Sequence, residues 1–232
     1  MFVMVVRIQH LDDSRLSAYV NLRHAETPTE FFIAEGRLPV ERLIASRYEV
    51  ESLVVQQGRE QEFASQVSPS TPIYSLSRTR LRELVGFDFH RGVLACGRRQ
   101  PLQSIEQLDW TQTELPLALA IIGVTELENV GSLLRSAAGF GIEHVLIGPQ
   151  TADPFSRRVI RVSMANLFTL QLYRLERPVE QFTQIQKLRR VRCVATSLDR
   201  GATPLPRFVP DTRPTILIVG NEASGLDREV LD

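Results

Sequence analysis

Residues 117–124 form an unbroken apolar run, and this run is the strongest constraint on the fold. A strand with one wet face alternates apolar and polar residues, whereas a run without alternation predicts a strand covered on both faces. Helices supply such cover in α/β proteins. The next segment supplies a helix, because Val130, Leu133, Leu134 and Ala137 recur at helical spacing. The sequence therefore predicts an α/β domain around this strand.

Strand and helix patterns alternate elsewhere too, and they divide the chain into three parts. Residues 1–100 predict a small α/β domain, and residues 117–232 predict a second one. Residues 101–116 lose periodicity and carry prolines at both ends, so we interpret them as a linker. The expected strands are 52–55, 73–76, 92–96, 145–147, 192–196 and 215–219, and the expected helices are 58–66, 78–85, 159–165 and 182–190.

The composition indicates a globular protein of the cytoplasm. Hydrophobic residues make up 43% and charged residues 23% of the 232 residues, which is ordinary for a soluble protein. No apolar run approaches the roughly 18 residues that span a bilayer, so no membrane partner is expected. The amino terminus lacks the basic region and the cleavage site of a signal peptide. Cys96 and Cys193 lack metal-ligand spacing and predict buried, reduced thiols, with no metal site.

The formal net charge is zero, which excludes a chain that is basic throughout but permits a local basic patch. Lys187 is the only lysine, and arginine suits phosphate binding better than lysine does, although genome base composition is the simpler explanation. Isolated arginine pairs are solvated faces by default. Two groups are nevertheless spaced to hold phosphates: Arg157, Arg158 and Arg161 at helical spacing, and Arg91, Arg98 and Arg99 in the first domain.

A polar motif, Asn129, Gly131 and Arg135, follows the apolar run where an open α/β sheet usually places its ligand. Asn129 is placed to cap the helix, because its side chain can accept a backbone N–H of the first turn. Gly131 leaves room for a ligand, and Arg135 lies one turn beyond it on the same helix face. The alternative is an ordinary capped helix with one solvated arginine, since short motifs have high false-positive rates.

A second motif follows the strand expected at 215–219. Gly220 allows a sharp turn, Glu222 lies at the carboxyl end of the strand, and Gly225 precedes a helix that opens at Asp227. A carboxylate here can orient a substrate hydroxyl, a cofactor amine or Arg135. The alternative is a solvated loop glutamate near a helix N-terminus, which is common and mildly stabilising.

Together these residues resemble the SpoU (TrmH-type) family of RNA 2′-O-ribose methyltransferases. That family carries Asn-x-Gly-x-x-x-Arg, matched at Asn129 through Arg135, and Gly-Asn-Glu-Gly-x-Gly-Leu, matched at 220–226 except that Ala223 replaces a glycine. Between them, the Gly-Phe-Gly at 139–141 and residues 156–168 also match. Residues 32–36 and 89–95 resemble the substrate-binding module of the family. The resemblance covers nearly the whole chain.

The resemblance implies a ribosomal protein L30e-like RNA-binding domain at 1–100 and an α/β-knot methyltransferase domain at 117–232. S-adenosylmethionine is the implied cofactor, held by Thr196, Leu198 and Gly220. Arg135 is implied to activate the ribose 2′-hydroxyl or to hold the adjacent phosphate, while Asn129 and Glu222 support the site. The protein then mainly aligns a nucleophile with an electrophilic sulfonium. The implied partners are RNA, with rRNA favoured over tRNA, and a second copy of the chain.

The family's third motif, a Ser-Leu-Asn-Val-Ser-like segment followed by a long helix, does not occur before Asp232. In the family that segment completes the cofactor pocket and builds much of the dimer interface. We therefore expect a truncated methyltransferase domain with weak or no methyl transfer, and we expect the missing segment to weaken dimerisation.

Two other functions are considered. A non-catalytic RNA-binding fragment is the alternative that the missing third motif favours. A Rossmann-type nucleotide-binding protein is disfavoured, because no Gly-x-Gly-x-x-Gly follows the apolar run at 117–124.

Overall fold

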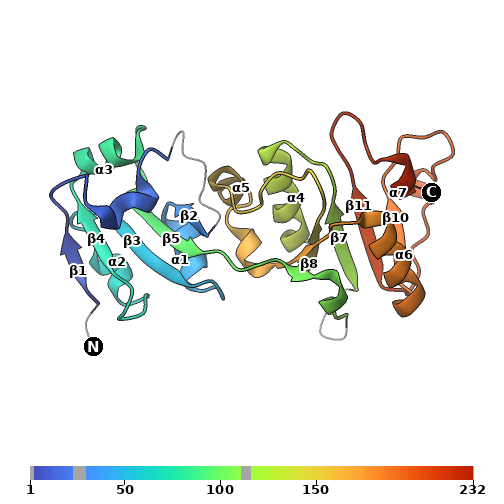
Figure 1. Ribbon diagram of the computed structural model, residues 1–232, viewed down its shortest axis with the longest axis horizontal. Coiled ribbons are helices and arrows are strands. Elements are labelled where there is room, and N and C mark those ends of the chain that lie inside the picture. The colour runs from blue at the N-terminus through green and yellow to red at the C-terminus, as the bar shows by residue number, and fades with distance from the viewer. Residues whose placement is uncertain (1–2, 23–29, 111–115, 232) are drawn as a thin grey trace. The chain divides into compact units, whose positions relative to one another are not determined.

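The computed structural model describes residues 3–22, 30–110 and 116–231 (Figure 1). The chain divides into two compact units. The N-terminal unit contains Met1–Gln100 together with Phe155–Phe168, and the C-terminal unit contains Pro101–Pro154 together with Thr169–Asp232. The N-terminal unit includes Phe155–Phe168, a segment within the range 117–232 that the sequence pattern assigns to the second domain.

The N-terminal unit is built on a five-stranded mixed sheet in the order β1-β4-β3-β5-β2. Strands β1, β4 and β3 are parallel, and β5 runs antiparallel to both β3 and β2. Its elements are β1 (Val5–Arg7), η1 (Ser14–Tyr19), β2 (Phe31–Glu35), α1 (Arg37–Ile44), β3 (Val50–Gln56), α2 (Gln61–Ala64), β4 (Ile73–Leu76), α3 (Arg78–Val85), β5 (Val93–Arg98) and α5 (Arg157–Val162), which leads into η3 (Asn166–Thr169).

Local sequence signals set the ends of α3. The Ser77 side chain accepts a hydrogen bond from the Arg80 backbone N–H and caps the first turn. Gly86 ends the helix in the left-handed conformation at φ 77°. In the core beneath, the fully buried Tyr19 hydroxyl donates to the Ser52 carbonyl and accepts from the Cys96 N–H. Buried polar groups are thus paired across three separate segments.

Aromatic packing explains why Phe155–Phe168 belongs to the N-terminal unit. Phe155 and Phe168 lie on either end of this segment, and the centroid of each ring is 5.3 Å from that of Phe32 on β2. Tyr48 completes the cluster, with an edge contact to Phe32 at 5.6 Å. All four side chains are buried. Burial of aromatic rings of this size, at distances typical of favourable ring pairs, holds the segment to the sheet.

The C-terminal unit is built on a six-stranded sheet in the order β10-β11-β7-β8-β9-β6, and every pairing in it is parallel. Its elements are β6 (Gln103–Ser104), η2 (Ile105–Gln107), β7 (Leu117–Ile121), α4 (Leu127–Gly139), β8 (His144–Ile147), β9 (Gln171–Arg174), α6 (Pro178–Arg189), β10 (Arg192–Ala195), η4 (Leu205–Arg207), β11 (Thr215–Val219) and α7 (Arg228–Leu231).

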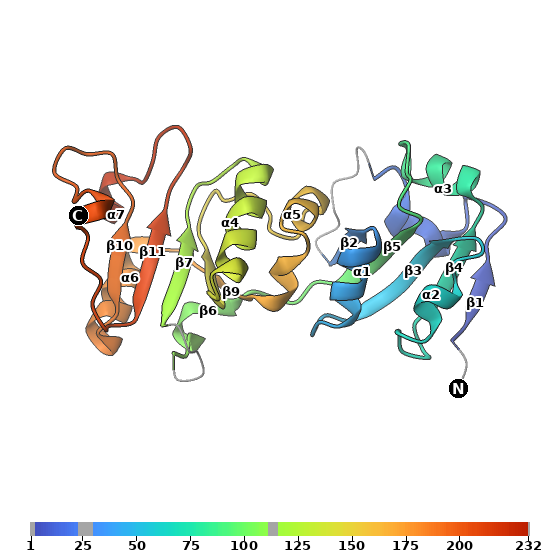
Figure 2. The same ribbon diagram turned by 180° about the vertical axis from the view of Figure 1, so that it is seen from behind.

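The apolar run forms β7, which lies between β11 and β8. Ala118 and Ala120 pack in one core with Phe182 and Ile185 of α6. Figure 2 shows α4 against the sheet on the side away from α6. The prediction of a strand covered on both faces is therefore confirmed. No helix in the described parts of the chain has the length and apolar character needed to cross a bilayer.

The residues interpreted as a linker, 101–116, are structured as far as residue 110. β6 pairs with β9 at the edge of the parallel sheet, and Ile105 and Leu108 are buried in the core of the C-terminal unit. The difference arises because a two-residue strand and a single turn are too short to show periodicity. Residues 111–115 lie outside the described residues.

Candidate functional site

The two polar motifs meet at the carboxyl edge of the parallel sheet. β7 and β11 are adjacent and in register, so the loops that follow them leave the same edge. The Glu222 carboxylate accepts hydrogen bonds from the Asn129 side-chain amide at 3.0 Å and from the backbone N–H groups of Glu126 at 3.2 Å and Thr125 at 3.4 Å. The Asn221 side-chain amide donates to the Gly123 carbonyl at 2.8 Å. Four hydrogen bonds therefore join the two loops.

Asn129 does not cap α4, and this prediction was wrong. The helix begins at Leu127 with Glu126 as its N-cap residue, so Asn129 lies inside the first turn. Glu222 supplies the acceptor instead, and it reaches the backbone just before the helix from the other loop. An acceptor that comes from a residue so distant in sequence cannot be found from the local pattern.

The hydrogen bonds also set the charge of Glu222. Burial by itself raises the pKa of this carboxyl group. Hydrogen bonds from the Asn129 amide and from the backbone N–H groups of Glu222 itself, Glu126 and Thr125 outweigh burial and lower the pKa below its ordinary value. The Glu222 side chain is therefore ionised at neutral pH and fixes the Asn129 amide with its N–H groups toward the carboxylate.

The turn after β11 requires glycine at position 220. A Cβ atom at Gly220 would lie 2.6 Å from the carbonyl carbon and oxygen of Gly225, which are backbone atoms that cannot move aside. Asn221 and Gly225 form two backbone hydrogen bonds across this loop, at 2.9 and 3.0 Å. The Asn221 side chain also accepts from the backbone N–H groups of Ala223 and Ser224. The loop is thus closed by its own hydrogen bonds.

A pocket of about 380 Å³ lies beside this loop, between the segments that follow β10 and β11. All three residues predicted to bind the cofactor, Thr196, Leu198 and Gly220, line it. The Leu198 side chain is fully exposed. Asp199 and Ser197 also line the pocket, although no sequence motif marks the loop after β10 that carries them.

Arg135 is not brought to the other motif residues. It lies on α4 with an exposed side chain and does not line the pocket. Six positions at about 100° each place it about 240° around the helix from Asn129. Among the described residues, the partners of the Glu222 carboxylate are Asn129 and backbone N–H groups rather than Arg135.

All six arginines predicted to bind RNA belong to the N-terminal unit. Two of them share one carboxylate, since Arg157 Nη1 lies 2.8 Å from Glu35 Oε2 and Arg91 Nε lies 3.8 Å from Glu35 Oε1. Glu35 is only 5% exposed. The Arg157 guanidinium also lies over the Phe87 ring, 4.7 Å from its centroid. Arg91 and Arg157 therefore have a structural role that their spacing in the sequence does not indicate.

The other four arginines differ in their surroundings. Arg98 pairs with Glu51 at 2.5 Å and with Glu49 at 3.4 Å. The Arg99 guanidinium donates to the Phe31 carbonyl and lies over the Phe155 ring. Arg158 is exposed and Arg161 is half-buried on α5. Acidic neighbours therefore neutralise part of the positive charge of the six arginines that are predicted to bind RNA.

The chain is similar to known proteins over nearly its whole length. The sequence model of the SpoU rRNA Methylase family matches residues 116–232. An uncharacterized tRNA/rRNA methyltransferase of Mycobacterium bovis is 32% identical over 231 residues, which cover 95% of this chain and 78% of that protein. The Bacillus subtilis 23S rRNA (guanosine(2553)-2′-O)-methyltransferase RlmP is 25% identical over 92% of this chain and 80% of its own length.

A solved structure has the same fold. The crystal structure of an AdoMet-bound rRNA methyltransferase from Sinorhizobium meliloti aligns with a TM-score of 0.81 and 21% identity, covering 98% of this chain and 85% of that one. The family model spans half of this chain, and the Mycobacterium bovis relative matches almost all of it. The chain therefore belongs to the SpoU rRNA methylase family.

Proposed function

We propose that this protein transfers the methyl group of S-adenosylmethionine to a ribose 2′-hydroxyl of RNA, and that its substrate is ribosomal RNA. The observation that carries the proposal is the contact between Asn129 and Glu222 beside the pocket lined by Thr196, Leu198 and Gly220. Relatives named as 2′-O-methyltransferases of 23S rRNA support the ribose as the acceptor and rRNA as the substrate.

The pocket fits the cofactor in size and lining. Its volume of about 380 Å³ lies within the roughly 300–1,000 Å³ typical of small-molecule sites. Gly220 brings bare backbone to the wall, where donors and acceptors can bind a nucleoside. Leu198 exposes a whole apolar side chain at this pocket, and a planar base above it would remove that surface from water. The Sinorhizobium meliloti relative was crystallised with AdoMet, which favours the same ligand here.

The sulfonium of S-adenosylmethionine supplies an electrophilic methyl group, so the protein needs to hold and orient a hydroxyl. Glu222 fixes the Asn129 amide, which leaves the Asn129 carbonyl oxygen facing away from the carboxylate as an acceptor for a substrate group. We assign to Arg135 the stabilisation of the developing alkoxide or the binding of the adjacent phosphate. The hydroxyl proton then leaves to solvent.

Arg135 serves the pocket of a second copy of the chain in this proposal. Its side chain lies on the exposed surface of α4 and does not line the pocket of its own chain. The last turn of the same helix leads to Phe140, an apolar side chain that is 78% exposed. An exposed cation and an exposed aromatic ring at one end of a helix suit a surface that a partner covers.

Residues 1–100 act in this proposal as the RNA-binding module, and residues 117–232 as the methyltransferase domain. The L30e-like resemblance of the first module and its arginines support this division. Phe155–Phe168 is an exception to this division. It lies between the two methyltransferase motifs in the sequence, but it belongs to the N-terminal unit of the structure.

The test is methyl transfer from tritiated S-adenosylmethionine to unmodified 23S rRNA, 16S rRNA and tRNA. We expect label in 23S rRNA, resistant to alkaline hydrolysis at one ribose. Arg135→Ala should reduce the rate constant at least 100-fold, whereas Arg177→Ala should not change it. Arg177 is a suitable control because it is an exposed arginine of the same unit, paired with Glu180. Label in a base, or full activity of Arg135→Ala, would contradict the proposal.

Mixing two impaired variants, at an S-adenosylmethionine concentration too low to saturate Gly220→Ala, tests the shared site. Arg135→Ala lacks the catalytic cation, and Gly220→Ala lacks a normal pocket. A mixture should recover up to about a quarter of wild-type activity if Arg135 acts on the partner's pocket, since hybrid dimers then carry one intact site. No recovery on mixing would refute the shared site, while activity of the wild type would still support methyl transfer.

A further inference from the structure

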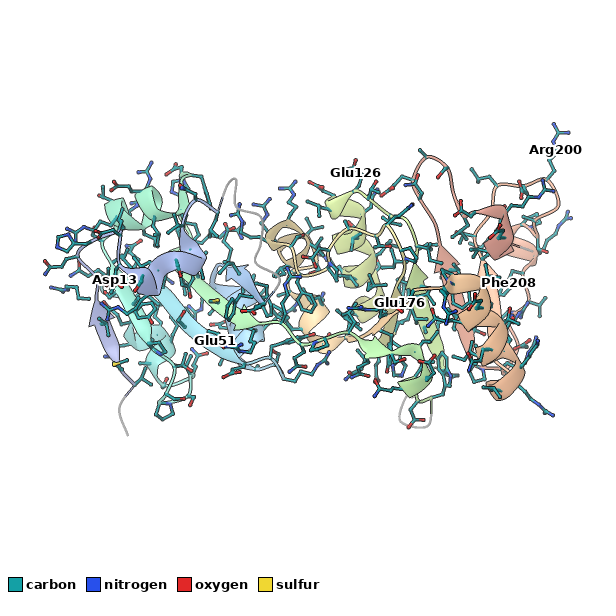
Figure 3. All side chains as sticks on the ribbon, in the orientation of Figure 1. Asp13, Glu51, Glu126, Glu176, Arg200 and Phe208 are labelled. Carbon is teal, nitrogen blue, oxygen red and sulfur yellow. The ribbon has the colours of Figure 1, made fainter. Side chains whose placement is uncertain are left out.

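The cofactor pocket contains carboxylates and no basic side chain among its described lining residues. Asp199 and Glu222 supply the two negative charges, and the other lining side chains are polar or apolar. The neighbouring Arg200 does not line the pocket, and its side chain extends outward from the loop in Figure 3. The charge of the pocket therefore comes from acidic groups alone.

The two carboxylates differ in what they bind. Glu222 is occupied by Asn129 and by backbone N–H groups. Within residues 3–22, 30–110 and 116–231, the Asp199 carboxylate has neither an ion-pair partner nor a hydrogen-bond partner, and the side chain is exposed. The Asp199 backbone is held in place, because its N–H donates to the Ser197 hydroxyl and its carbonyl accepts from Ala202. Asp199 thus offers an unpaired negative charge at the pocket, carried on a backbone that is held by two hydrogen bonds.

The substrate and product forms of the cofactor differ by one positive charge. S-adenosylmethionine carries a sulfonium, an ammonium and a carboxylate, so its net charge is positive. When the S–CH₃ bond breaks and the O–CH₃ bond forms, sulfur keeps the electron pair and the hydroxyl proton leaves to solvent. The product, S-adenosylhomocysteine, is a neutral thioether with no net charge. A negative pocket therefore interacts more favourably with the substrate form than with the product form.

We propose that Asp199 is a specificity residue that makes the pocket prefer the charged methyl donor over its neutral product. The inference rests on the proposed function, because it assumes that this pocket holds S-adenosylmethionine. The consequence is weak product inhibition. Because the pocket binds S-adenosylhomocysteine less tightly than S-adenosylmethionine, the product is released readily after each methyl transfer. A unit charge several ångströms away, at a solvent-accessible site, changes a binding constant by roughly threefold to tenfold.

The test measures three dissociation constants by calorimetry on the full chain, for S-adenosylmethionine, S-adenosylhomocysteine and sinefungin. Sinefungin replaces the methylated sulfur by a carbon that bears an ammonium, so it keeps the charge without the sulfonium. Asp199→Asn should raise the dissociation constants of S-adenosylmethionine and sinefungin by roughly threefold or more, and it should leave that of S-adenosylhomocysteine nearly unchanged. Glu143→Gln is the control, because Glu143 is an exposed carboxylate that precedes β8 at the opposite edge of the sheet.

The outcomes separate the inference from the function on which it rests. If the wild type binds none of the three ligands, the proposed function fails and the inference fails with it. If the wild type binds them and Asp199→Asn weakens all three equally, or none, the function stands and the specificity role of Asp199 is refuted. If Asp199→Asn loses affinity threefold for S-adenosylmethionine and sinefungin only, and Glu143→Gln loses none, the specificity role of Asp199 is supported.

Discussion

Replacing Glu35 by glutamine should destabilise the N-terminal unit, because it removes the charge that holds two arginines. The carboxylate is 5% exposed at the end of β2, with Arg157 at 2.8 Å and Arg91 at 3.8 Å. Glutamine keeps the size of the side chain and one acceptor oxygen, so packing changes little. The variant therefore tests the ionic contribution rather than the volume of the core.

The magnitude follows from the burial of the three partners. Removing one partner of a fully buried ion pair costs about 3–5 kcal/mol, and a hydrogen bond to a charged group contributes about 1.5–3 kcal/mol. Arg157 is 24% exposed and Arg91 is 45% exposed, so water can reach both cations after the change. The lower range therefore applies, and we expect a loss of about 2 kcal/mol in the free energy of unfolding. For a chain of this size, that loss lowers Tm by roughly 4–8 °C.

Urea unfolding, followed by far-ultraviolet circular dichroism, measures the loss in the free energy of unfolding. A double-mutant cycle with Arg157→Met shows how much of that loss comes from the contact between Glu35 and Arg157. The coupling free energy between positions 35 and 157 should be about 1–2 kcal/mol. Glu49→Gln is the matched control, because Glu49 is 70% exposed and pairs with Arg98, so its change should stay within about 0.5 kcal/mol. A loss below about 0.5 kcal/mol for Glu35→Gln, or a coupling near zero, would refute the reasoning.

Three further predictions concern packing, the pocket and the thiols. Gly97→Ala should cost about 1–3 kcal/mol in urea unfolding, because its Cβ would overlap the Phe32 ring, which its aromatic neighbours hold in place. Gly220→Ala should weaken S-adenosylmethionine binding at least 10-fold in calorimetry, since its Cβ would press on the backbone 2.6 Å away; unchanged affinity would contradict the assigned turn. Cys96 is buried as expected, whereas Cys193 is half-buried rather than buried. Burial raises the pKa of the Cys96 thiol to about 12 and that of the Cys193 thiol to about 11, so both should react with Ellman's reagent at pH 8 much more slowly in the native protein than after unfolding; equal rates in the two states would contradict this prediction.

The sequence predicts those parts of the fold whose pattern is long enough to read. The run that forms β7 is apolar because helices cover both faces of that strand, and the 3.6-residue repeat of α4 follows from its single buried face. The edge strands β1 and β6 escape prediction, because they have three and two residues and need no continuous apolar pattern. The position of Phe155–Phe168 escapes it too, since its aromatic partners Phe32 and Tyr48 are more than 100 residues away.

The same distinction applies to the candidate site. Thr196, Leu198 and Gly220 line one pocket, because residues that follow adjacent parallel strands emerge at one edge of the sheet; their binding of a cofactor stays a prediction. The partners of a charged side chain are harder to predict. Arg157 is spaced to face RNA phosphates, yet Glu35, which lies 122 positions earlier, takes its guanidinium. Charge pairs between distant segments depend on the tertiary fold, so local spacing gives no information about them.

The contact between Asn129 and Glu222 shows why two short motifs carry more information together than apart. The 93 positions between them include the whole of Phe155–Phe168, which joins the other unit, so the length of chain between the motifs does not fix their distance. The pairing of Leu117 with Thr215 does fix it, because β7 and β11 then end together and both loops begin at the same level of the sheet. A change that shifts this register would separate Glu222 from Asn129 even with every motif residue intact. Sheet register, rather than sequence separation, is therefore the structural requirement of the site.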